Sequence, residues 1–118
     1  MDLRDLVQAL LRRDALTARQ WVADAGREAM VWTDVPRPIG CTAVELAVAA
    51  GVAELLASRV KQPPPSWTAT VRETPVPVYL VRAAETMPRL RRLCETEGPE
   101  PLRWRHVFAP PEFLTIAK

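Results

Sequence analysis

The residues of this sequence that could do binding chemistry gather in its last third, where arginines stand beside a tryptophan. The segment Arg103-Trp104-Arg105 combines two forked cations with a flat aromatic ring. Such a combination is favoured at protein interfaces, and it also suits phosphates and single-stranded nucleic acid. Residues 82–118 hold seven basic and five acidic residues, so the whole formal charge of +2 arises there. The residues predicted to bind a partner are Arg89, Arg92, Arg103, Trp104, Arg105 and Phe108.

Three interpretations of these arginines are open. They can form a solvated helix face paired with Glu95, Glu97 and Glu100, a surface that binds an acidic protein, or a surface that binds nucleic acid. A formal charge of +2 is small for a nucleic-acid-binding or membrane-surface protein of 118 residues. Between the two binding functions we therefore expect a protein partner.

Residues suited to catalysis are scarce. The chain has one histidine, and its His, Cys, Asp and Glu residues show no metal-ligand spacing. Its four glycines are scattered, so they form no phosphate-binding loop. Cys94 and His106 are the one candidate pair of nucleophile and base. Because Cys94 falls on a predicted apolar helix face, we expect it to act as a small apolar residue of the core and not as a nucleophile. We therefore predict that the protein is not an enzyme and that it binds no cofactor and no metal.

The element that must support any such site is a helix over residues 42–61. Thr42 and Glu45 have the spacing of a capping box, in which each side chain satisfies a backbone N–H at the helix start. Apolar residues then occupy most positions around the helix, which is typical of a buried central helix. The alternative is a helix-turn-helix with its turn at Gly51. The residues after Gly51 include few polar side chains that could contact base edges, so we expect one continuous helix.

Two shorter helices precede it. Residues 3–11 carry an apolar stripe at helical spacing, which predicts an amphipathic helix. Thr17 and Gln20 have capping-box spacing, so a second helix is predicted from Thr17 to about Met30. Because only a short link joins the two, we expect a helical hairpin.

The chain after residue 61 is rich in proline. Residues 62–68 must leave the helix as polyproline-like backbone, which either binds a partner's aromatic groove or crosses over within the domain. We expect an internal crossover with Trp67 on the core. We also expect Trp32 to anchor the loop over residues 32–41, which precedes the central helix, against the helices. Residues 78–81 fit a lone edge strand, and no sheet is predicted because no second strand is recognisable.

One further helix is predicted near the C-terminus. Thr86 stands as its cap before Pro88, and Gly98 ends it. Its apolar face is expected to be Met87, Leu90, Leu93 and Cys94, and the chain from His106 onward is expected to be irregular. The whole chain is therefore predicted to be a single all-α domain, with a helical core over residues 1–61 and a proline-rich wrap, one helix and a tail over residues 62–118.

The composition predicts the compartment as well. Two cysteines outside any paired motif favour free thiols in a reducing compartment. The N-terminus has the charge pattern of an amphipathic helix and lacks that of a signal peptide, and no apolar run approaches the ~18 residues that cross a bilayer. We expect a cytoplasmic protein without membrane contacts.

The order of short motifs in the C-terminal half adds a resemblance. These motifs are Pro64-Pro65-Ser66-Trp67-Thr68, Met87-Pro88-Arg89-Leu90-Arg91, Pro99-Glu100-Pro101-Leu102-Arg103 and Val107-Phe108-Ala109-Pro110-Pro111. Together they resemble small bacterial proteins encoded beside nucleotidyltransferase-like partners in toxin–antitoxin-type gene pairs, and tails appended to some helix-turn-helix regulators. The resemblance implies a non-enzymatic, antitoxin-like module that binds a bacterial nucleotidyltransferase. The alternative is a helix-turn-helix DNA-binding regulator.

Overall fold

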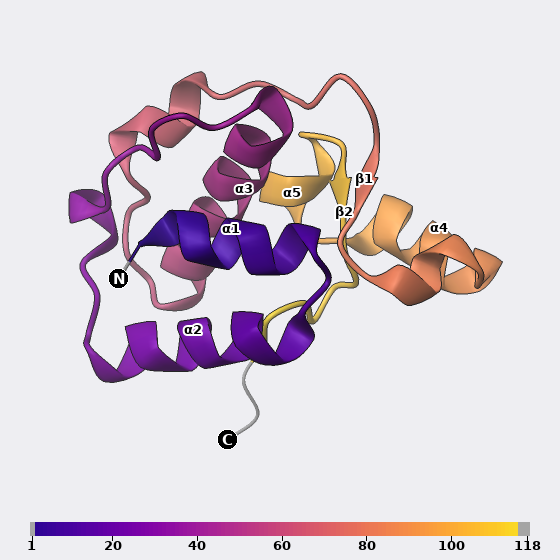
Figure 1. The fold of residues 1–118 in the computed structure, drawn as a ribbon, viewed down its shortest axis with the longest axis horizontal. Helices are drawn as coiled ribbons and strands as arrows, with labels where there is room; N and C mark the ends of the chain where they lie inside the picture. Colours follow the sequence, from indigo (N-terminus) through magenta and orange to yellow (C-terminus); the bar gives the residue numbers. More distant parts are fainter. Residues whose placement is uncertain (1, 116–118) are drawn as a thin grey trace.

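The computed structural model describes residues 2–115 as a mostly helical fold arranged around helix α3 (Ala43–Arg59), as Figure 1 shows. The predicted capping box is present: the Glu45 N–H donates to the Thr42 hydroxyl at 3.1 Å, and the Thr42 N–H donates to the Glu45 carboxylate at 2.9 Å. Every residue from Ala47 to Ala57 is buried except Glu54. The continuous buried helix is therefore confirmed, and the chain makes no helix-breaking turn at Gly51.

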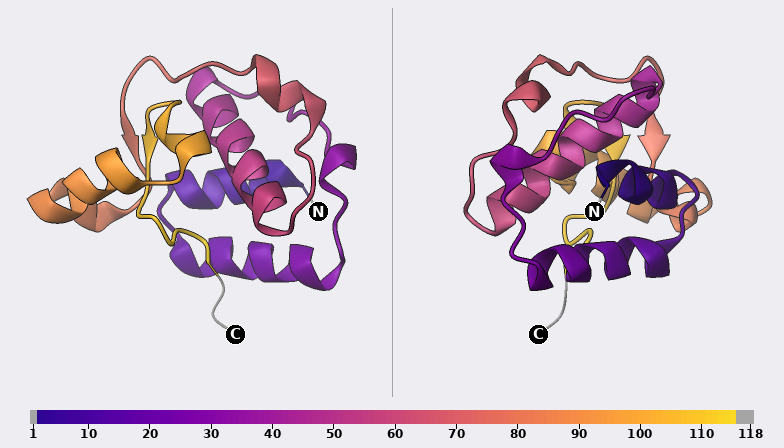
Figure 2. Two further views of the ribbon diagram at one scale, coloured as in Figure 1. Left: turned by 180° about the vertical axis from the view of Figure 1, so that it is seen from behind. Right: turned by 60° about the vertical axis from the view of Figure 1, so that its left-hand side comes forward.

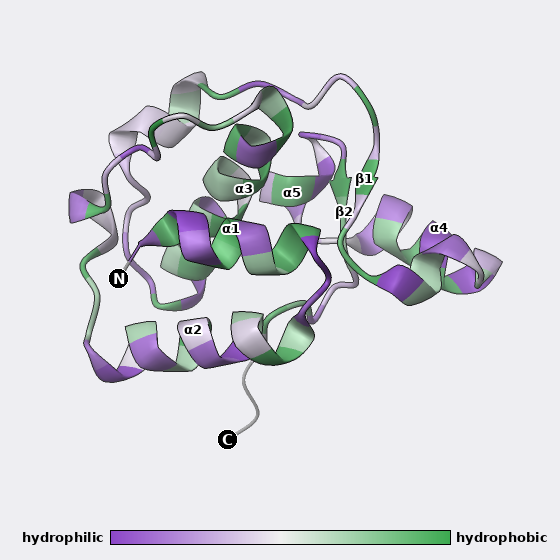
Figure 3. Ribbon diagram, viewed as in Figure 1, coloured by the Kyte–Doolittle hydropathy of each residue, from purple (hydrophilic) through white to green (hydrophobic). Residues whose placement is uncertain are grey.

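Helices α1 (Leu3–Leu11) and α2 (Ala15–Arg27) form the predicted hairpin. Figure 3 shows hydrophilic and hydrophobic residues alternating along α1, whose apolar side chains are buried. The prediction that Thr17 caps the second helix is wrong. Asp14 is the cap, because its carboxylate accepts from both the N–H and the hydroxyl of Thr17, which also holds the pKa of Asp14 below its usual range. A carboxylate one turn earlier caps at least as well as a hydroxyl.

Short 3₁₀ helices lie in the loops on either side of α3. These helices are η1 (Trp32–Asp34) and η2 (Ser66–Thr70). Trp32 is buried, as predicted, and the Trp67 indole N–H donates to the Val35 carbonyl at 2.9 Å. Because Trp67 also packs against the core, the proline-rich segment is an internal crossover, as predicted.

A pair of two-residue strands corrects the prediction that no sheet forms. β1 (Val78–Tyr79) runs parallel to β2 (Val107–Phe108), with Val78 opposite Val107. The Val78 N–H donates to the His106 carbonyl, and the Leu80 N–H donates to the Phe108 carbonyl, each at 2.9 Å. The region after His106 is thus more regular than expected. Strands of two residues are too short for an alternating pattern to reveal them.

The predicted C-terminal helix is α4 (Pro88–Glu97), which follows η3 (Arg82–Glu85) and precedes the short helix α5 (Glu100–Arg103). Thr86 is not its cap, because the Thr86 hydroxyl donates to the Ala83 carbonyl and Met87 occupies the cap position without a side-chain hydrogen bond. Met87 is 53% exposed, so it is not part of the apolar face. Only Cys94 of α4 is fully buried. In Figures 1 and 2, α4 projects from one end of the molecule.

Helix α5 packs closely against α3 at Gly51. A Cβ added at Gly51 would lie 2.5 Å from the Leu102 Cδ2 atom and 3.1 Å from the Pro101 carbonyl oxygen. Leu102 is fully buried, so its side chain has no free space to move into. Gly51 is therefore required for close packing of α5, and this explains a glycine in the middle of a buried helix.

This contact predicts that Gly51→Ala destabilises the fold. Forced overpacking costs about 1–3 kcal/mol, whereas the better helix propensity of alanine returns only about 1 kcal/mol. Gly26→Ala is the matched control, because Gly26 lies in α2 and an added Cβ meets nothing within 4 Å. Urea unfolding followed by tryptophan fluorescence should show a lower midpoint for Gly51→Ala and an equal or higher one for Gly26→Ala. Equal midpoints for the two variants would contradict this account of Gly51.

Candidate functional site

Arg105 is the predicted site residue whose environment differs most from expectation. Its side chain is fully buried, and each of its five N–H donors has an acceptor. The guanidinium contacts both oxygens of Glu54, at 2.8 and 3.1 Å. The remaining donors reach backbone carbonyls at 2.9–3.2 Å, which belong to Thr68, Val71 and Pro101.

Arg105 is therefore a structural residue, and the expectation that it contacts a partner is corrected. The sequence shows an arginine in a basic segment, but its acceptors come from α3, from η2 and the residue after it, and from α5. Only the folded chain brings those segments to one place.

Two other predicted residues also have internal roles. The Arg103 guanidinium donates to the Thr96 carbonyl in the last turn of α4, where helix carbonyls lack intrahelical partners. The ring of Phe108 is half-buried, and its centroid lies 5.3 Å from that of Tyr79. Trp104 is 44% exposed, and its ring covers the Arg105 guanidinium at 4.1 Å. One edge of Trp104 thus remains accessible, whereas Arg103 and Phe108 chiefly hold α4 and the small sheet.

Arg89 and Arg92 are the predicted residues that remain available for binding. Both are exposed and lie three positions apart on α4, so they share one face of the helix. Within residues 2–115, neither guanidinium has a hydrogen-bond or ion-pair partner. We call this pair the arginine face of α4.

The charge order along α4 is unfavourable for the helix itself. Arginines occupy its N-terminal half and glutamates its C-terminal half, with no acidic residue in the first turn and no basic residue in the last. A helix dipole favours the opposite order, by about 0.3–1 kcal/mol per charge. Helix stability therefore gives no reason for arginines at these positions.

Polar contacts fix the inner side of α4. The Tyr79 hydroxyl donates to the Glu95 carboxylate, and the Arg91 guanidinium lies 4.7 Å from the Tyr79 ring centroid. The hydrogen bond to Glu95 raises the pKa of Tyr79. These contacts join α4 to strand β1 through Arg91 and Glu95.

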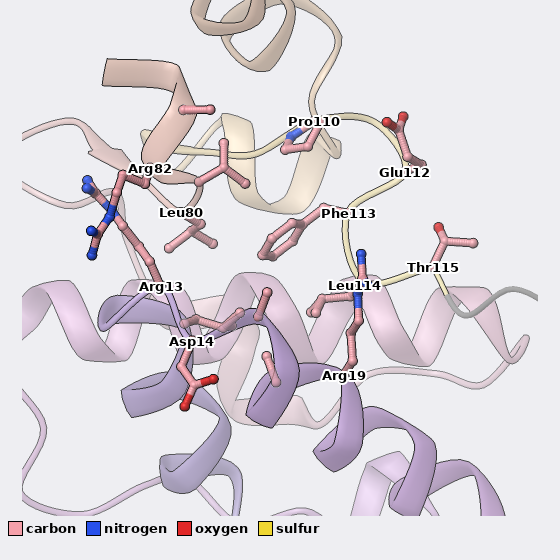
Figure 4. Close-up of a pocket in the computed structure, with 15 residues that line it drawn as sticks. Arg13, Asp14, Arg19, Leu80, Arg82, Pro110, Glu112, Phe113, Leu114 and Thr115 are labelled. Carbon is pink, nitrogen blue, oxygen red and sulfur yellow. The ribbon is translucent and has the colours of Figure 1, made fainter. Parts of the chain in front are cut away.

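A pocket of about 370 Å³ lies between the α1–α2 turn, η3 and the C-terminal tail, as Figure 4 shows. Its interior is apolar, with Leu10, Leu80 and Leu114 buried and Phe113 packed against the core. The arginines that line it are Arg13, Arg19 and Arg82. This pocket is not predictable from the sequence, because segments far apart in the chain contribute its walls and no periodic pattern joins them.

The geometry gives little support to catalysis by Cys94. Cys94 is fully buried, and burial raises the pKa of its thiol, so the reactive thiolate is disfavoured. Within residues 2–115, no group of three or more His, Cys, Asp and Glu side chains is placed to hold a metal ion. In the same range, no helix is both long and apolar enough to cross a lipid bilayer.

Arg105 and Arg92 make a matched pair for testing structural against surface roles. Arg105→Ala leaves Glu54 without its partner, and breaking a buried ion pair in this way costs about 3–5 kcal/mol. Arg92→Ala removes an exposed side chain and should change stability by less than about 0.5 kcal/mol. Thermal unfolding followed by circular dichroism measures both. A small change for Arg105→Ala would mean that the network around Glu54 contributes little to the fold.

The two thiols should differ in reactivity. Cys41 is half-buried and Cys94 is fully buried, and both are free. Ellman's reagent should modify one thiol per chain in the native protein and both after denaturation, since modification needs access and a thiolate. Cys41→Ser should abolish the native signal. Rapid modification of Cys94 in that variant would show that its thiol is reactive after all.

Comparison of this chain with protein-family models, curated proteins and solved structures finds no match.

Proposed function

We propose that this chain is a non-enzymatic protein-binding module whose arginine face on α4 contacts an acidic surface of another protein. The observation that carries the proposal is that Arg89 and Arg92 are exposed and unpaired within residues 2–115, on a helix that projects from the body (Figure 1). Arginine forks bind carboxylates in bidentate geometry, and charge complementarity across an interface provides specificity and fast association.

Other arginines of the same region support this choice by elimination. Arg91, Arg103 and Arg105 make internal contacts, and each of those contacts holds α4, α5 or the sheet in place. Within residues 2–115, the remaining arginines of α4, Arg89 and Arg92, make no internal hydrogen bond or ion pair, and the order of charges on α4 opposes the helix dipole. A binding function explains both features.

The resemblance of the C-terminal half suggests one class of partner. Under this proposal the chain is an antitoxin-like module, and its partner is a bacterial nucleotidyltransferase with an acidic patch that fits α4. The DNA-binding alternative is less well supported, because helix α3 is unbroken at Gly51 and its residues from Ala47 to Ala57 are almost all buried. Such a helix has no free face to place in a DNA groove.

The proposal predicts that Arg89→Glu with Arg92→Glu weakens binding to the partner encoded beside this chain. Reversing two contacting charges converts attraction into repulsion, so affinity should fall at least tenfold (about 1.4 kcal/mol). The two proteins are co-expressed, the tagged chain is purified, and the complex is measured by calorimetry. The unfolding temperature of the variant should stay close to that of the wild type.

Arg37→Glu with Arg72→Glu is the matched control. Both arginines are exposed and lie outside α4, and the variant carries the same change of net charge. It should keep the partner. Equal loss of binding in both double variants would show that total charge matters and the α4 face does not. Retained binding in the α4 variant would refute the proposed site directly.

A further inference from the structure

The pocket between the α1–α2 turn, η3 and the tail joins an apolar interior to a cationic edge. In Figure 4, Phe113 and Leu114 face its centre, and the guanidinium groups of Arg13 and Arg82 lie together on one side. The Arg19 side chain extends from α2 towards Leu114 on the other side. A ligand seated on the apolar floor would therefore have a cation at either end.

Glu85 lies close enough to Arg13 and Arg82 to interact with both charges, whereas the two acidic side chains that line the pocket are turned away from its centre. Asp14 and Glu112 line the pocket, and Figure 4 shows both carboxylates pointing away from the centre. Asp14 is engaged as the cap of α2. Because these two carboxylates face outward, the pocket presents its cations to a ligand.

The three arginines differ in how free they are. Arg13 is paired with Glu85 and also donates to the Tyr79 carbonyl. Arg19 and Arg82 are exposed, and within residues 2–115 neither has a hydrogen-bond or ion-pair partner. These two can therefore bind a ligand without giving up a contact of the fold.

The pocket is connected to the arginine face of α4 by shared residues. Arg13 also lines an open hollow beside it, together with Arg91. Arg91 in turn lines a smaller hollow with Arg92. Glu85 and Glu95 line both hollows with these arginines, so the surface between the pocket and α4 carries mixed charge.

We propose that the pocket receives one apolar side chain of an acidic segment of the partner protein, while Arg19 and Arg82 bind carboxylates on either side of that side chain. This inference assumes that the partner is a protein, and so it rests on the function proposed above. A volume of about 370 Å³ falls in the range of small ligand sites, about 300–1,000 Å³, and so accommodates a phenylalanine or leucine side chain. Apolar anchors in pockets typically dominate interface energetics, while surrounding charges set orientation.

The observations favour an acidic peptide over nucleic acid. Binding to single strands relies on exposed aromatic faces on which bases stack. The aromatic residue of this pocket, Phe113, is half-buried and packed against the core. An apolar floor flanked by the guanidinium groups of Arg19 and Arg82 instead complements an apolar side chain between carboxylates.

The test uses two short fluorescein-labelled peptides of glutamate, one with phenylalanine at its centre and the other with alanine. Each is titrated with the full chain, and binding is followed by fluorescence anisotropy at low and at physiological salt. We expect the phenylalanine peptide to bind about tenfold more tightly at both salt concentrations, which corresponds to about 1.4 kcal/mol. Equal affinity for the two peptides overturns the proposal, as does tighter binding of a labelled single-stranded oligonucleotide.

Variants locate the anchor. Ala83→Trp and Ala15→Trp place a bulky ring at exposed positions that line the pocket, so no core contact is lost. They should remove the advantage of the phenylalanine peptide and leave the alanine peptide unaffected. Arg19→Glu with Arg82→Glu should weaken both peptides at least tenfold, whereas Arg37→Glu with Arg72→Glu should preserve the preference. If the preference survives Ala83→Trp and Ala15→Trp, the anchor binds elsewhere and the proposal is overturned.

The same variants separate this inference from the function it rests on. Suppose that Ala83→Trp binds the natural partner at full affinity, while Arg89→Glu with Arg92→Glu does not bind it. This result would reject the anchor pocket and retain the α4 face as the binding site. The opposite pattern would reject the α4 face while supporting the pocket.

Discussion

The fold depends on one buried cation. Placing the guanidinium of Arg105 in the interior costs several kcal/mol in lost hydration unless every donor is satisfied, and all five are. The acceptors are a carboxylate on α3 and three backbone carbonyls, two from η2 and the residue after it and one from α5. Proline-rich chain is short of N–H donors, so its buried carbonyls need donors from elsewhere. A side chain with five donors and no acceptor supplies them, and in doing so fixes the wrap to the core helix.

This constraint accounts for the composition of α3. Arg105 reaches Glu54 only if α5 lies close to α3, and that approach needs a residue without a Cβ at Gly51. The Pro101 carbonyl shows the connection directly, since it lies against Gly51 and also accepts from Arg105. Glycine and alanine on this helix therefore serve close packing. The face of α3 at Gly51 is covered by α5.

Sequence reasoning succeeded where the signal is local. The capping box at Thr42, the apolar stripe of α1 and the all-round burial of α3 each depend on residues within a few turns, and each is confirmed. Sequence reasoning failed where a residue's contacts come from distant segments of the chain. Two local caps were also assigned wrongly. Asp14 and Thr17 compete for the start of α2, and only the geometry of the turn selects between them. At α4, the Thr86 hydroxyl donates to the Ala83 carbonyl instead of capping the helix.

The same distinction between local and distant contacts applies to the candidate site. The sequence identified the arginine-rich region, and Arg89 and Arg92 are exposed there, but it could not separate them from Arg105, whose side chain is equally charged and fully buried. The pocket was missed because its floor and its cations come from α1, α2, η3 and the tail. A residue's type shows what it can bind, whereas its availability depends on which acceptors the fold has already given it.

The contacts that anchor α4 affect how the arginine face and the pocket could bind one partner together. This helix buries only Cys94, so apolar packing alone does not explain its fixed position. Polar contacts hold it instead: Tyr79 to Glu95 on one side, and Arg103 to the last turn on the other. These contacts set the distance between the arginine face and the pocket. A partner that contacts both the arginine face and the pocket must match that distance. Two modest contacts at a set spacing then give more affinity than either contact alone, because the second contact forms without a further loss of translational and rotational freedom.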